Sequence, residues 1–404
     1  MNILFLTLSD IRSIESHGIY SDLLREFVKN GDDVYIMSVA ERKTGIRSGW
    51  IEEREHSHVL KIKTGNIQKT KFIEKGISTV LLGHQLRQGA KKYLNGLRFD
   101  LIMYSTPPVT IADTVAFLKR KYSAKTYLLQ KDITPQTFID LGVLPKSGIK
   151  GTIYKYFLMK EKKLYRVSDI IGCTSQANID YIVQHNPQIE KKKVRYSPNA
   201  IEVQNVVIEE PDKITLREKY GIPQDKMIFV YGGNLGVPQD VPFILDIIEA
   251  TTNAQVFFLI VGSGTEYQKI EKYIQTQKPN NLKLMRSLPH EEYDRMLACC
   301  DVGLVFLNRN YTVPNTPSRI LSYMQAHLPV LACIDRYNDL GDIILSGDFG
   351  WYCYTGEVSA FEEIVQEIVR KMDFNKGNNG YRFLCNHYTS KIQHELIMKQ
   401  ISEV

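Results

Sequence analysis

A glycine-rich junction near the middle of the chain has residue types that could bind phosphate. Residues 228–246, IFVYGGNLGVPQDVPFILD, join an apolar strand-like run to a helical pattern, and Gly232, Gly233 and Gly236 surround Asn234 there. Such glycines bring bare backbone close to a ligand, and the N–H groups and dipole of a helix start favour a phosphate. An ordinary tight turn uses the same residue types. The junction alone leaves a phosphate site and a plain turn open.

The elements around this junction belong to a two-part α/β pattern. Short apolar strands alternate with amphipathic helical segments, which predicts two doubly wound, Rossmann-like domains with parallel sheets covered on both faces. The expected domains are residues 1–205 and 206–377, and a helix over 378–404 should return to the first domain. In this fold the carboxyl ends of the strands carry the ligand loops, which should face a central cleft. The expected strands are NILFLTLS, DVYIMSV, FDLIMYST, KTYLLQ and DIIGCTS, then MIFVYGG, VFFLIVGSG, LKLMRS, DVGLVFL, PVLACI and GWYCY.

The composition supports this division. The 404 residues exceed one ordinary core, and 43% hydrophobic with 24% charged residues is typical of a globular protein. The start, MNILFLTLSD, reads as a first strand rather than a signal peptide, and no apolar run approaches the ~20 residues of a membrane span. The six cysteines follow no disulfide or metal-ligand spacing. We therefore expect a cytoplasmic protein with reduced, buried cysteines.

The net charge of +6 conceals a difference between the halves. Residues 1–205 carry 32 basic and 20 acidic side chains, and residues 206–404 carry 19 and 25. The basic excess is concentrated in residues 61–98 and 146–166, which hold nine basic side chains to one acid and seven to one. This asymmetry argues against a nucleic-acid partner wrapped by the whole molecule. It favours a first domain that rests peripherally on an anionic membrane surface, the inner face of the cell membrane.

Taken together, the ordered motifs resemble those of a GT-B fold glycosyltransferase of family 4 over essentially the whole chain. YSPNAIEV resembles the family's hinge, YGGNLGVPQDV its phosphate turn, and TPSRILSYMQAHLPVLA its donor helix. QKDITPQTFIDLGVL resembles a narrower branch, the L-fucosaminyltransferase-like enzymes of surface-polysaccharide synthesis. The resemblance implies an acceptor site in the first domain and a nucleotide-sugar site in the second.

The implied donor site departs from the family at its cations. Most members carry an arginine and a lysine where this chain has Asn234 and Gln239. Arg319 is the expected replacement, because a guanidinium offers a forked, permanently charged grip on two phosphate oxygens; a solvated helix arginine is the alternative. The donor-binding residues implied by the resemblance are Gly232, Gly233, Asn234, Gln239, Gly262, Arg286, Ser287, Ser318, Arg319 and Ser322.

The family's paired glutamates are also replaced. Asn315 and Ser322 stand where members carry two glutamates seven residues apart, and the second of these normally binds ribose hydroxyls. We therefore expect a differently arranged contact with the ribose. Ser318 could bond phosphate or could simply be a helix N-cap. Arg286 and Ser287 lie where the family reads the base through backbone groups.

In the first domain four residues are candidates for the acceptor side and for catalysis. His17 and Gly18 match the family's acceptor-side glycine loop. Asp132 follows the strand KTYLLQ, and its carboxylate could bond sugar hydroxyls or stabilise a positive anomeric carbon; a turn aspartate before Pro135 is the alternative. Lys131 could pair with it or meet an acceptor phosphate. The expected catalytic residues are Asp132 and Arg319.

The helix expected within residues 147–167 combines apolar side chains with lysines. It could approach lipid headgroups or pack on the first sheet, and both can hold. The resemblance implies a retaining glycosyltransferase that moves a sugar from a nucleotide diphosphate, with UDP expected, to a lipid-linked saccharide in capsule, O-antigen or exopolysaccharide synthesis. No cofactor and no metal are expected. A non-catalytic scaffold subunit and a UDP-sugar 2-epimerase are the alternatives.

Overall fold

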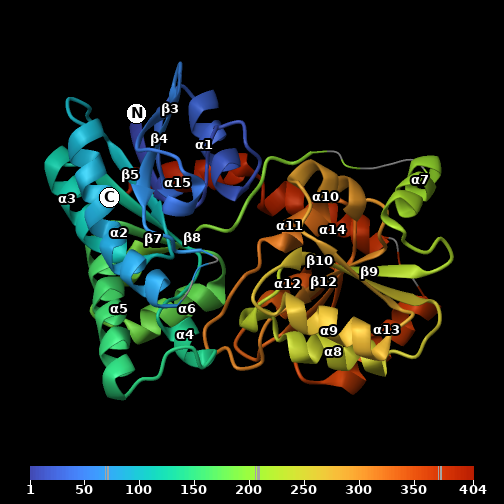
Figure 1. Cartoon of the computed structure of the whole chain (residues 1–404). Helices are drawn as coiled ribbons and strands as arrows, with labels where there is room; N and C mark the ends of the chain where they lie inside the picture. Colours follow the sequence, from blue (N-terminus) through green and yellow to red (C-terminus); the bar gives the residue numbers. More distant parts are fainter. Residues whose placement is uncertain (69, 71, 205, 207–209, 372, 374) are drawn as a thin grey trace. The chain divides into compact units, whose positions relative to one another are not determined.

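The chain folds into two compact units, which we describe in a computed structural model (Figure 1). The structure describes every residue except 69, 71, 205, 207–209, 372 and 374. Unit 1 comprises residues 1–202 and 390–404, and unit 2 comprises residues 203–389. The expected domain boundary at residue 205, and Lys69 and Lys71 of the basic stretch, lie outside the described residues.

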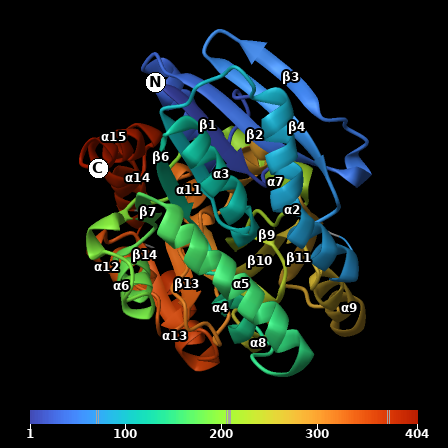
Figure 2. The same cartoon turned by 90° about the vertical axis from the view of Figure 1, so that its left-hand side faces the viewer.

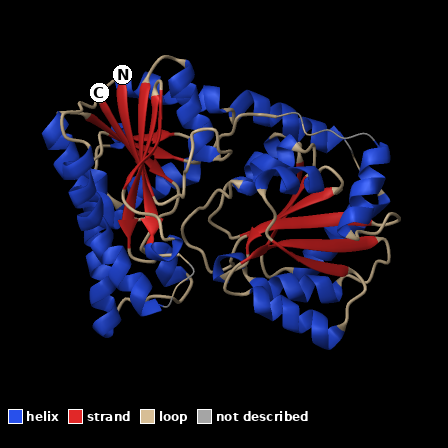
Figure 3. Ribbon diagram, turned by 45° about the horizontal axis from the view of Figure 1, so that its top comes forward, coloured by secondary structure: helices blue, strands red, loops and turns tan. Residues whose placement is uncertain are grey.

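Unit 1 is built on an eight-stranded sheet in the order β3-β4-β2-β1-β5-β6-β7-β8. All neighbouring strands are parallel except β3 and β4, which form an antiparallel edge. The inner strands are continuous apolar runs because helices cover both faces of the sheet (Figure 3). The strands are β1 (Asn2–Thr7), β2 (Asp33–Glu41), β3 (Gly49–Arg54), β4 (Ser57–Thr64), β5 (Leu101–Ser105), β6 (Lys125–Gln130), β7 (Ile170–Cys173) and β8 (Val194–Tyr196).

The helices of unit 1 follow the strands as crossover connections. The helix expected from about Gly18 begins at Ile19, and Asn30 and Gly31 end it. Three further elements, α2, α3 and the short turn η2, pack against one another, and α3 and η2 also pack against α5. The helical elements are α1 (Ile19–Lys29), η1 (Arg42–Thr44), α2 (Phe72–Tyr93), η2 (Val109–Ile111), α3 (Ala112–Tyr122), α4 (Gln136–Asp140), α5 (Gly148–Val167), α6 (Gln176–His185) and η3 (Lys191–Lys193).

Unit 2 is built on a six-stranded, all-parallel sheet in the order β11-β10-β9-β12-β13-β14. Every strand expected in this half is present, and the phenylalanines of β9, β10 and α8 form much of its core. The strands are β9 (Met227–Asn234), β10 (Val256–Ser263), β11 (Leu282–Arg286), β12 (Val302–Phe306), β13 (Val330–Ile334) and β14 (Gly350–Tyr354). The helical elements are α7 (Glu210–Tyr220), η4 (Val237–Gln239), α8 (Val241–Ala250), α9 (Tyr267–Gln277), α10 (His290–Leu297), α11 (Arg319–Gln325), α12 (Leu340–Ser346), α13 (Val358–Arg370) and α14 (Asn375–His387).

The C-terminal segment differs from the single helix expected over 378–404. It contains two helices, α14 in unit 2 and α15 (Ser390–Ser402) in unit 1. The backbone N–H of Ser390 donates to the carbonyl oxygen of Ile201 at 2.8 Å, which fixes the break. Beyond it, Ile397 and Ile401 join the core of unit 1. The chain returns to the first unit because this second helix has its own apolar face.

Two further expectations concerned reduced, buried cysteines and the lack of a membrane-spanning segment. All six cysteines are free, and five of them are buried. Within the described part of the chain, no helix is both long enough and apolar enough to cross a membrane.

Candidate active site

Three predicted donor residues lie in one row across the sheet of unit 2. Gly233 on β9 pairs with Gly262 on β10, and Gly262 pairs with Arg286 on β11, each at the carboxyl end of its strand. A Cβ atom at Gly262 would lie 2.1 Å from the carbonyl oxygen of Gly233, so only glycine fits there. Gly233 has φ +136°, a conformation that other residues adopt at a cost. The row presents bare backbone at the edge where ligands of this fold bind.

The amide side chains of the turn bond each other. Nδ2 of Asn234 donates to Oε1 of Gln239 at 2.8 Å, and the same oxygen accepts the N–H of Gly236 at 3.1 Å. The hydroxyl of Tyr231 donates to the carbonyl oxygen of Asn234 at 2.6 Å. Asn234 and Gln239 therefore shape the turn, and their contact with phosphate stays a prediction.

Arg319 brings a positive charge to this turn. It is the first residue of α11, and its Nη1 donates to the carbonyl oxygen of Gly232 at 2.9 Å. Its guanidinium carbon lies 4.4 Å from the centre of the Tyr231 ring, and a Cβ atom at Gly233 would lie 3.0 Å from Nη1. Among the described residues no carboxylate lies within ion-pair distance of Arg319. Burial opposes its charge, but the oxygens of Tyr231 and Tyr323 nevertheless leave the pKa of Arg319 above its usual value.

Two further tyrosines pack under the turn, and the sequence analysis missed them. The N–H of Gly232 donates to the hydroxyl of Tyr323 at 3.2 Å, and that hydroxyl donates to the carbonyl oxygen of Leu304 at 2.9 Å. Burial raises the pKa of Tyr323 to about 12. A Cβ atom at Gly232 would lie 1.8 Å from the hydroxyl oxygen of Tyr293, so this side chain requires a glycine above it. An aromatic residue in a strand or helix usually indicates a core position, so the sequence did not reveal that these tyrosines support the turn.

The remaining donor-side candidates lie around the same edge. Arg286 is exposed, stacks on Tyr267 with its guanidinium carbon 3.7 Å from the ring centre, and lies 4.0 Å from Glu271. Ser287 follows it and is exposed. Ser318 occupies the N-cap position of α11, but its side chain makes no capping hydrogen bond.

The positions of the replaced glutamates are Asn315 and Ser322. Ser322 is half-buried on α11. Asn315 accepts a hydrogen bond from Nδ2 of Asn338 through its carbonyl oxygen, at 2.6 Å. A ribose contact at these two positions stays a prediction.

In unit 1, Lys131 and Asp132 directly follow β6, as expected. Nε2 of Gln130 donates to the carbonyl oxygen of Asp132 at 2.8 Å, and the N–H of Lys131 donates to Oγ1 of Thr106 at 3.3 Å. Desolvation by the surrounding protein raises the pKa of Asp132 to about 6, although part of the side chain faces solvent, and Lys131 opposes this rise. Desolvation also lowers the pKa of Lys131 to about 7. Asp132 belongs to unit 1 and Arg319 to unit 2.

Two of the predicted acceptor-side residues, His17 and Gly18, lie at the start of α1. His17 is exposed, and Gly18 has φ +151° at the N-cap position. The N–H of Gly18 donates to Oδ1 of Asp22 at 3.1 Å. The loop before the helix is thus tied to the helix's own first turn.

Arg25 anchors this loop from within unit 1. Its Nη1 donates to the carbonyl oxygens of Ile14 at 2.5 Å and Ser16 at 3.0 Å. Its Nη2 donates to Oδ1 of Asp22 at 2.5 Å, and its Nε donates to Oε2 of Glu202 at 3.0 Å. No sequence motif pointed to this residue, because a helix arginine usually faces solvent.

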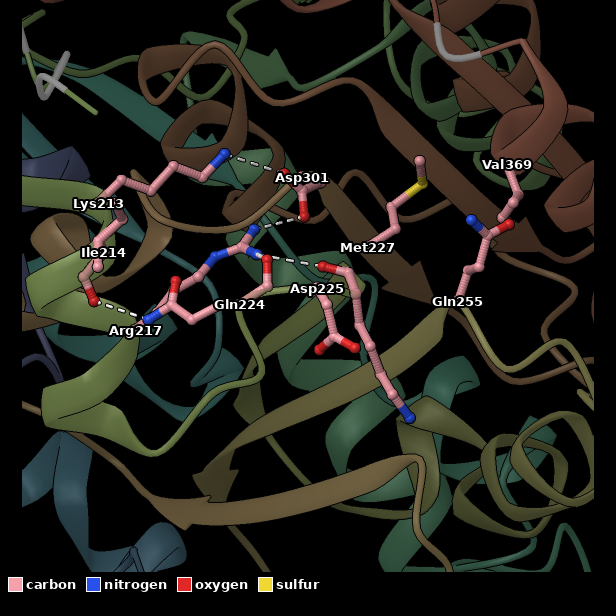
Figure 4. A pocket seen from close by; sticks show the side chains of 10 residues that line it. Lys213, Ile214, Arg217, Gln224, Asp225, Met227, Gln255, Asp301 and Val369 are labelled. Atoms are coloured by element: carbon pink, nitrogen blue, oxygen red, sulfur yellow. Dashed lines mark hydrogen bonds and ion pairs between the residues drawn. The ribbon is translucent and has the colours of Figure 1, made fainter. Parts of the chain in front are cut away.

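A hollow of about 580 Å³ lies elsewhere in unit 2 (Figure 4). Met227, the first residue of β9, lines it, so it opens at the edge of the sheet opposite the glycine turn. Arg217 and Lys213 are both paired with Asp301 there, at 2.7 Å and 3.1 Å. Both of these cations are thus paired, and the hollow contains none of the candidate residues.

The two doubly wound units, with their ligand loops at the carboxyl ends of the strands, define the GT-B class of protein. Solved structures agree with this fold over the whole chain. Anabaena Alr3699/HepE in complex with UDP matches with a TM-score of 0.71 and 16% identity, covering 100% of each chain. Sucrose-phosphate synthase (tll1590) from Thermosynechococcus elongatus matches with a TM-score of 0.75 and 15% identity, covering 100% of this chain and 98% of its own.

Within that class a family model matches part of unit 2. Residues 212–379 match the family model described as glycosyl transferases group 1, and the chain carries a domain of this family. It is 26% identical over 279 residues to the "Probable glycosyltransferase WbjE" of Pseudomonas aeruginosa, covering 67% of this chain and 66% of that protein. It is 22% identical over 248 residues to the "Putative colanic acid biosynthesis glycosyl transferase WcaI" of Escherichia coli K12, covering 60% of each. The matches therefore span about two thirds or less of these relatives. The predicted fold is confirmed, and so is a glycosyltransferase group 1 domain in residues 212–379. The narrower L-fucosaminyltransferase-like branch stays a prediction.

Proposed function

We propose that this protein is a retaining glycosyltransferase that takes a sugar from a UDP-sugar. The observation that carries the proposal is Arg319, a guanidinium without a carboxylate partner among the described residues, beside the bare backbone of Gly232 and Gly233. A charge left uncompensated at a glycine turn suits a diphosphate, which accepts charge-assisted hydrogen bonds. The Anabaena structural neighbour was crystallised in complex with UDP and with UDP-glucose, which supports UDP as the nucleotide.

The chemistry expected at this turn is stabilisation of a departing diphosphate. The bond between the anomeric carbon and the diphosphate oxygen breaks, and negative charge develops on that oxygen. Arg319 and the turn amides stabilise this charge without a metal ion. The departing phosphate takes the proton of the acceptor hydroxyl, and the acceptor oxygen bonds to the anomeric carbon on the face that the diphosphate leaves, which gives retention. Asp132 would stabilise the positive anomeric carbon.

We propose that the acceptor is a lipid-linked saccharide of surface-polysaccharide synthesis, such as capsule, O-antigen or exopolysaccharide. The names of both relatives describe glycosyltransferases, one of them in colanic acid biosynthesis, which supports this substrate class. Such an acceptor would require the protein to bind at the inner face of the membrane.

The helices α2 and α5 offer a surface for that binding (Figure 2). Ile77, Leu81 and Met159 are large apolar side chains with 57%, 48% and 56% of their surface exposed. On α5, the exposed cations Lys155 and Lys162 flank Met159 at helical spacing. Exposed apolar side chains among cations match the chemistry of an anionic lipid surface.

The test of the enzymatic proposal is a panel of UDP-sugars incubated with the purified protein. We expect UDP to bind by calorimetry with equal affinity in Mg²⁺ and in EDTA, and one UDP-sugar to be hydrolysed slowly without acceptor. Epimerised sugar nucleotide would favour the 2-epimerase instead. Absence of UDP binding would contradict the proposal and would favour a scaffold subunit.

The membrane proposal has its own test by vesicle co-sedimentation. The protein should bind phosphatidylglycerol vesicles better than phosphatidylcholine vesicles, and 1 M salt should release it because the attraction is screened. Met159→Asp and Leu81→Asp should weaken binding. Ile214→Asp, at a 48% exposed position on α7 of unit 2, is the matched control and should bind like the wild type. Equal binding by all variants would contradict the proposed surface.

A further inference from the structure

The aromatic ring of Tyr231 contacts the guanidinium of Arg319, and unlike a carboxylate it carries no negative charge. We propose that Tyr231 is a positioning residue for the diphosphate site, because its ring fixes the Arg319 guanidinium without neutralising it. The guanidinium carbon lies 4.4 Å from the ring centre, within the range of a cation–π interaction. The inference rests on the proposed donor site and names the side chain that prepares it.

Another stacked arginine in the same unit shows what is different about Arg319. The guanidinium carbon of Arg336 lies 4.3 Å from the ring centre of Tyr354, nearly the same distance. Arg336, however, also forms an ion pair with Glu357 at 2.7 Å. A carboxylate is an anion that occupies the donor fork a diphosphate would use, whereas the neutral ring of Tyr231 leaves the charge of that fork uncompensated. Arg319 alone of this pair is held and still free to bind an anion.

The Tyr231 ring is itself rigidly placed. Tyr231 is fully buried in β9, and its hydroxyl donates to the carbonyl oxygen of Asn234 at 2.6 Å. One side chain therefore shapes the glycine turn with its hydroxyl and holds the cation with its face. Arg319 also donates a hydrogen bond to the carbonyl oxygen of Gly232, the residue that follows Tyr231 in the chain. Guanidinium and turn backbone are thus fixed relative to each other before any ligand binds, which reduces the entropy lost on binding.

The experiment compares UDP with uridine, which lacks phosphate, on variants at position 231. Tyr231→Phe keeps the ring and should bind UDP within about threefold of the wild type. Tyr231→Leu removes the ring and should bind UDP about tenfold or more weakly. Uridine affinity should change less than twofold in both variants, because a general loss of structure would weaken both ligands alike. Equal UDP affinity in the wild type and Tyr231→Leu would overturn the inference.

A second series covers the case in which Tyr231→Leu fails to fold. Phenylalanines with increasing fluorination at position 231 keep the ring shape but weaken its attraction for a cation. UDP affinity should fall stepwise with fluorination while uridine affinity stays constant, and a flat UDP series would overturn the inference. If the wild type binds no UDP at all, the proposed function fails and the inference falls with it. If the wild type binds UDP and the series is flat, only the role of Tyr231 fails.

Discussion

The guanidinium of Arg319 donates a 2.9 Å hydrogen bond to the carbonyl oxygen of Gly232, a residue 87 positions away in the sequence. This bond joins the start of α11 to the glycine turn after β9. It places the cation beside the backbone that we propose binds the diphosphate.

Removing the cation should weaken donor binding and slow transfer. Arg319→Ala should lower turnover about a hundredfold, because one charged contact with the departing phosphate contributes ~3 kcal/mol. The turnover of Arg319→Lys should lie between those of Arg319→Ala and the wild type, since lysine keeps the positive charge but lacks the forked pair of donors. Hydrolysis of the preferred UDP-sugar measures both. Arg336→Ala is the control, because that arginine is stacked and paired with Glu357, and it should match the wild type. Unchanged turnover in Arg319→Ala would remove this residue from the site.

A side chain at Gly233 should disturb the same contact. Its φ of +136° disfavours other residues, and a Cβ atom would lie 3.0 Å from Nη1 of Arg319. We expect Gly233→Ala to bind UDP about tenfold more weakly by calorimetry, with a strain cost of ~1 kcal/mol in stability. Gly221→Ala, at φ +57° after α7, should show a similar loss of stability and normal UDP affinity. Equal UDP affinity in both variants would show that the turn does not contact the ligand.

Most of the fold could be predicted from the sequence because the strands of a parallel sheet are continuous apolar runs. β9 and β13 are of this kind. β3, with the sequence GWIEER, was missed because it is a half-exposed edge strand. β4 was missed because Lys61 interrupts its apolar pattern, although this lysine is fully buried and paired with Asp10 at 2.5 Å. The sequence does not show which partner makes a buried lysine tolerable.

Only those site residues that belong to sequence motifs could be predicted. The glycines, and Arg319 at a helix start, could be placed by their motifs, and the structure brings Gly232, Gly233 and Arg319 together. Tyr231 could not be assigned, because an aromatic residue in a strand indicates core and its second role depends on α11, which begins far along the chain at Arg319. Asn234 and Gln239 were expected to face phosphate, but one amide can bond another within a turn. Such pairings depend on side-chain geometry that spacing does not determine.

Arg25 should stabilise the acceptor-side loop. It is buried and donates to Ile14, Ser16, Asp22 and Glu202, so removing it takes one donor from two carbonyl oxygens and one cation from two carboxylates. Arg25→Ala should lower the free energy of unfolding by about 3 kcal/mol. Hydrogen exchange in residues 10–18 should become faster than in the rest of unit 1.

The control for this loop lies one turn further along α1. Lys29 also pairs with Glu202, at 2.7 Å, but is half exposed. Lys29→Ala should lower the free energy of unfolding by less than about 1 kcal/mol and leave residues 10–18 protected from hydrogen exchange. Equal exchange of residues 10–18 in wild type and Arg25→Ala would contradict the anchoring role.

Glu161 should make stability fall as pH rises. It is 6% exposed on α5, and burial raises the pKa of its carboxyl to about 8, although a hydrogen bond from Tyr165 opposes the rise. Because the folded pKa exceeds the unfolded value of 4.5, the folded state holds this proton more tightly. The resulting stability is complete below pH 4.5 and is lost as pH rises through 8.

Replacing this carboxyl with an amide should remove the pH dependence. Glu161→Gln should be more stable than the wild type at pH 9 by a few kcal/mol, and nearly equal to it at pH 5. Denaturant unfolding at the two pH values measures the difference. Glu53→Gln, at an exposed position on β3, should have nearly the same free energy of unfolding as the wild type at both pH values. A Glu161→Gln effect that is equal at pH 5 and pH 9 would contradict a buried, protonated carboxyl.

The central claim is that a diphosphate binds between the glycine turn and Arg319. A crystal structure of the wild-type protein with UDP tests it most directly. We predict that the diphosphate contacts the backbone of Gly233 and the guanidinium of Arg319, with that guanidinium still stacked on Tyr231. A UDP molecule bound away from this turn, or none bound at millimolar concentration, would contradict the account.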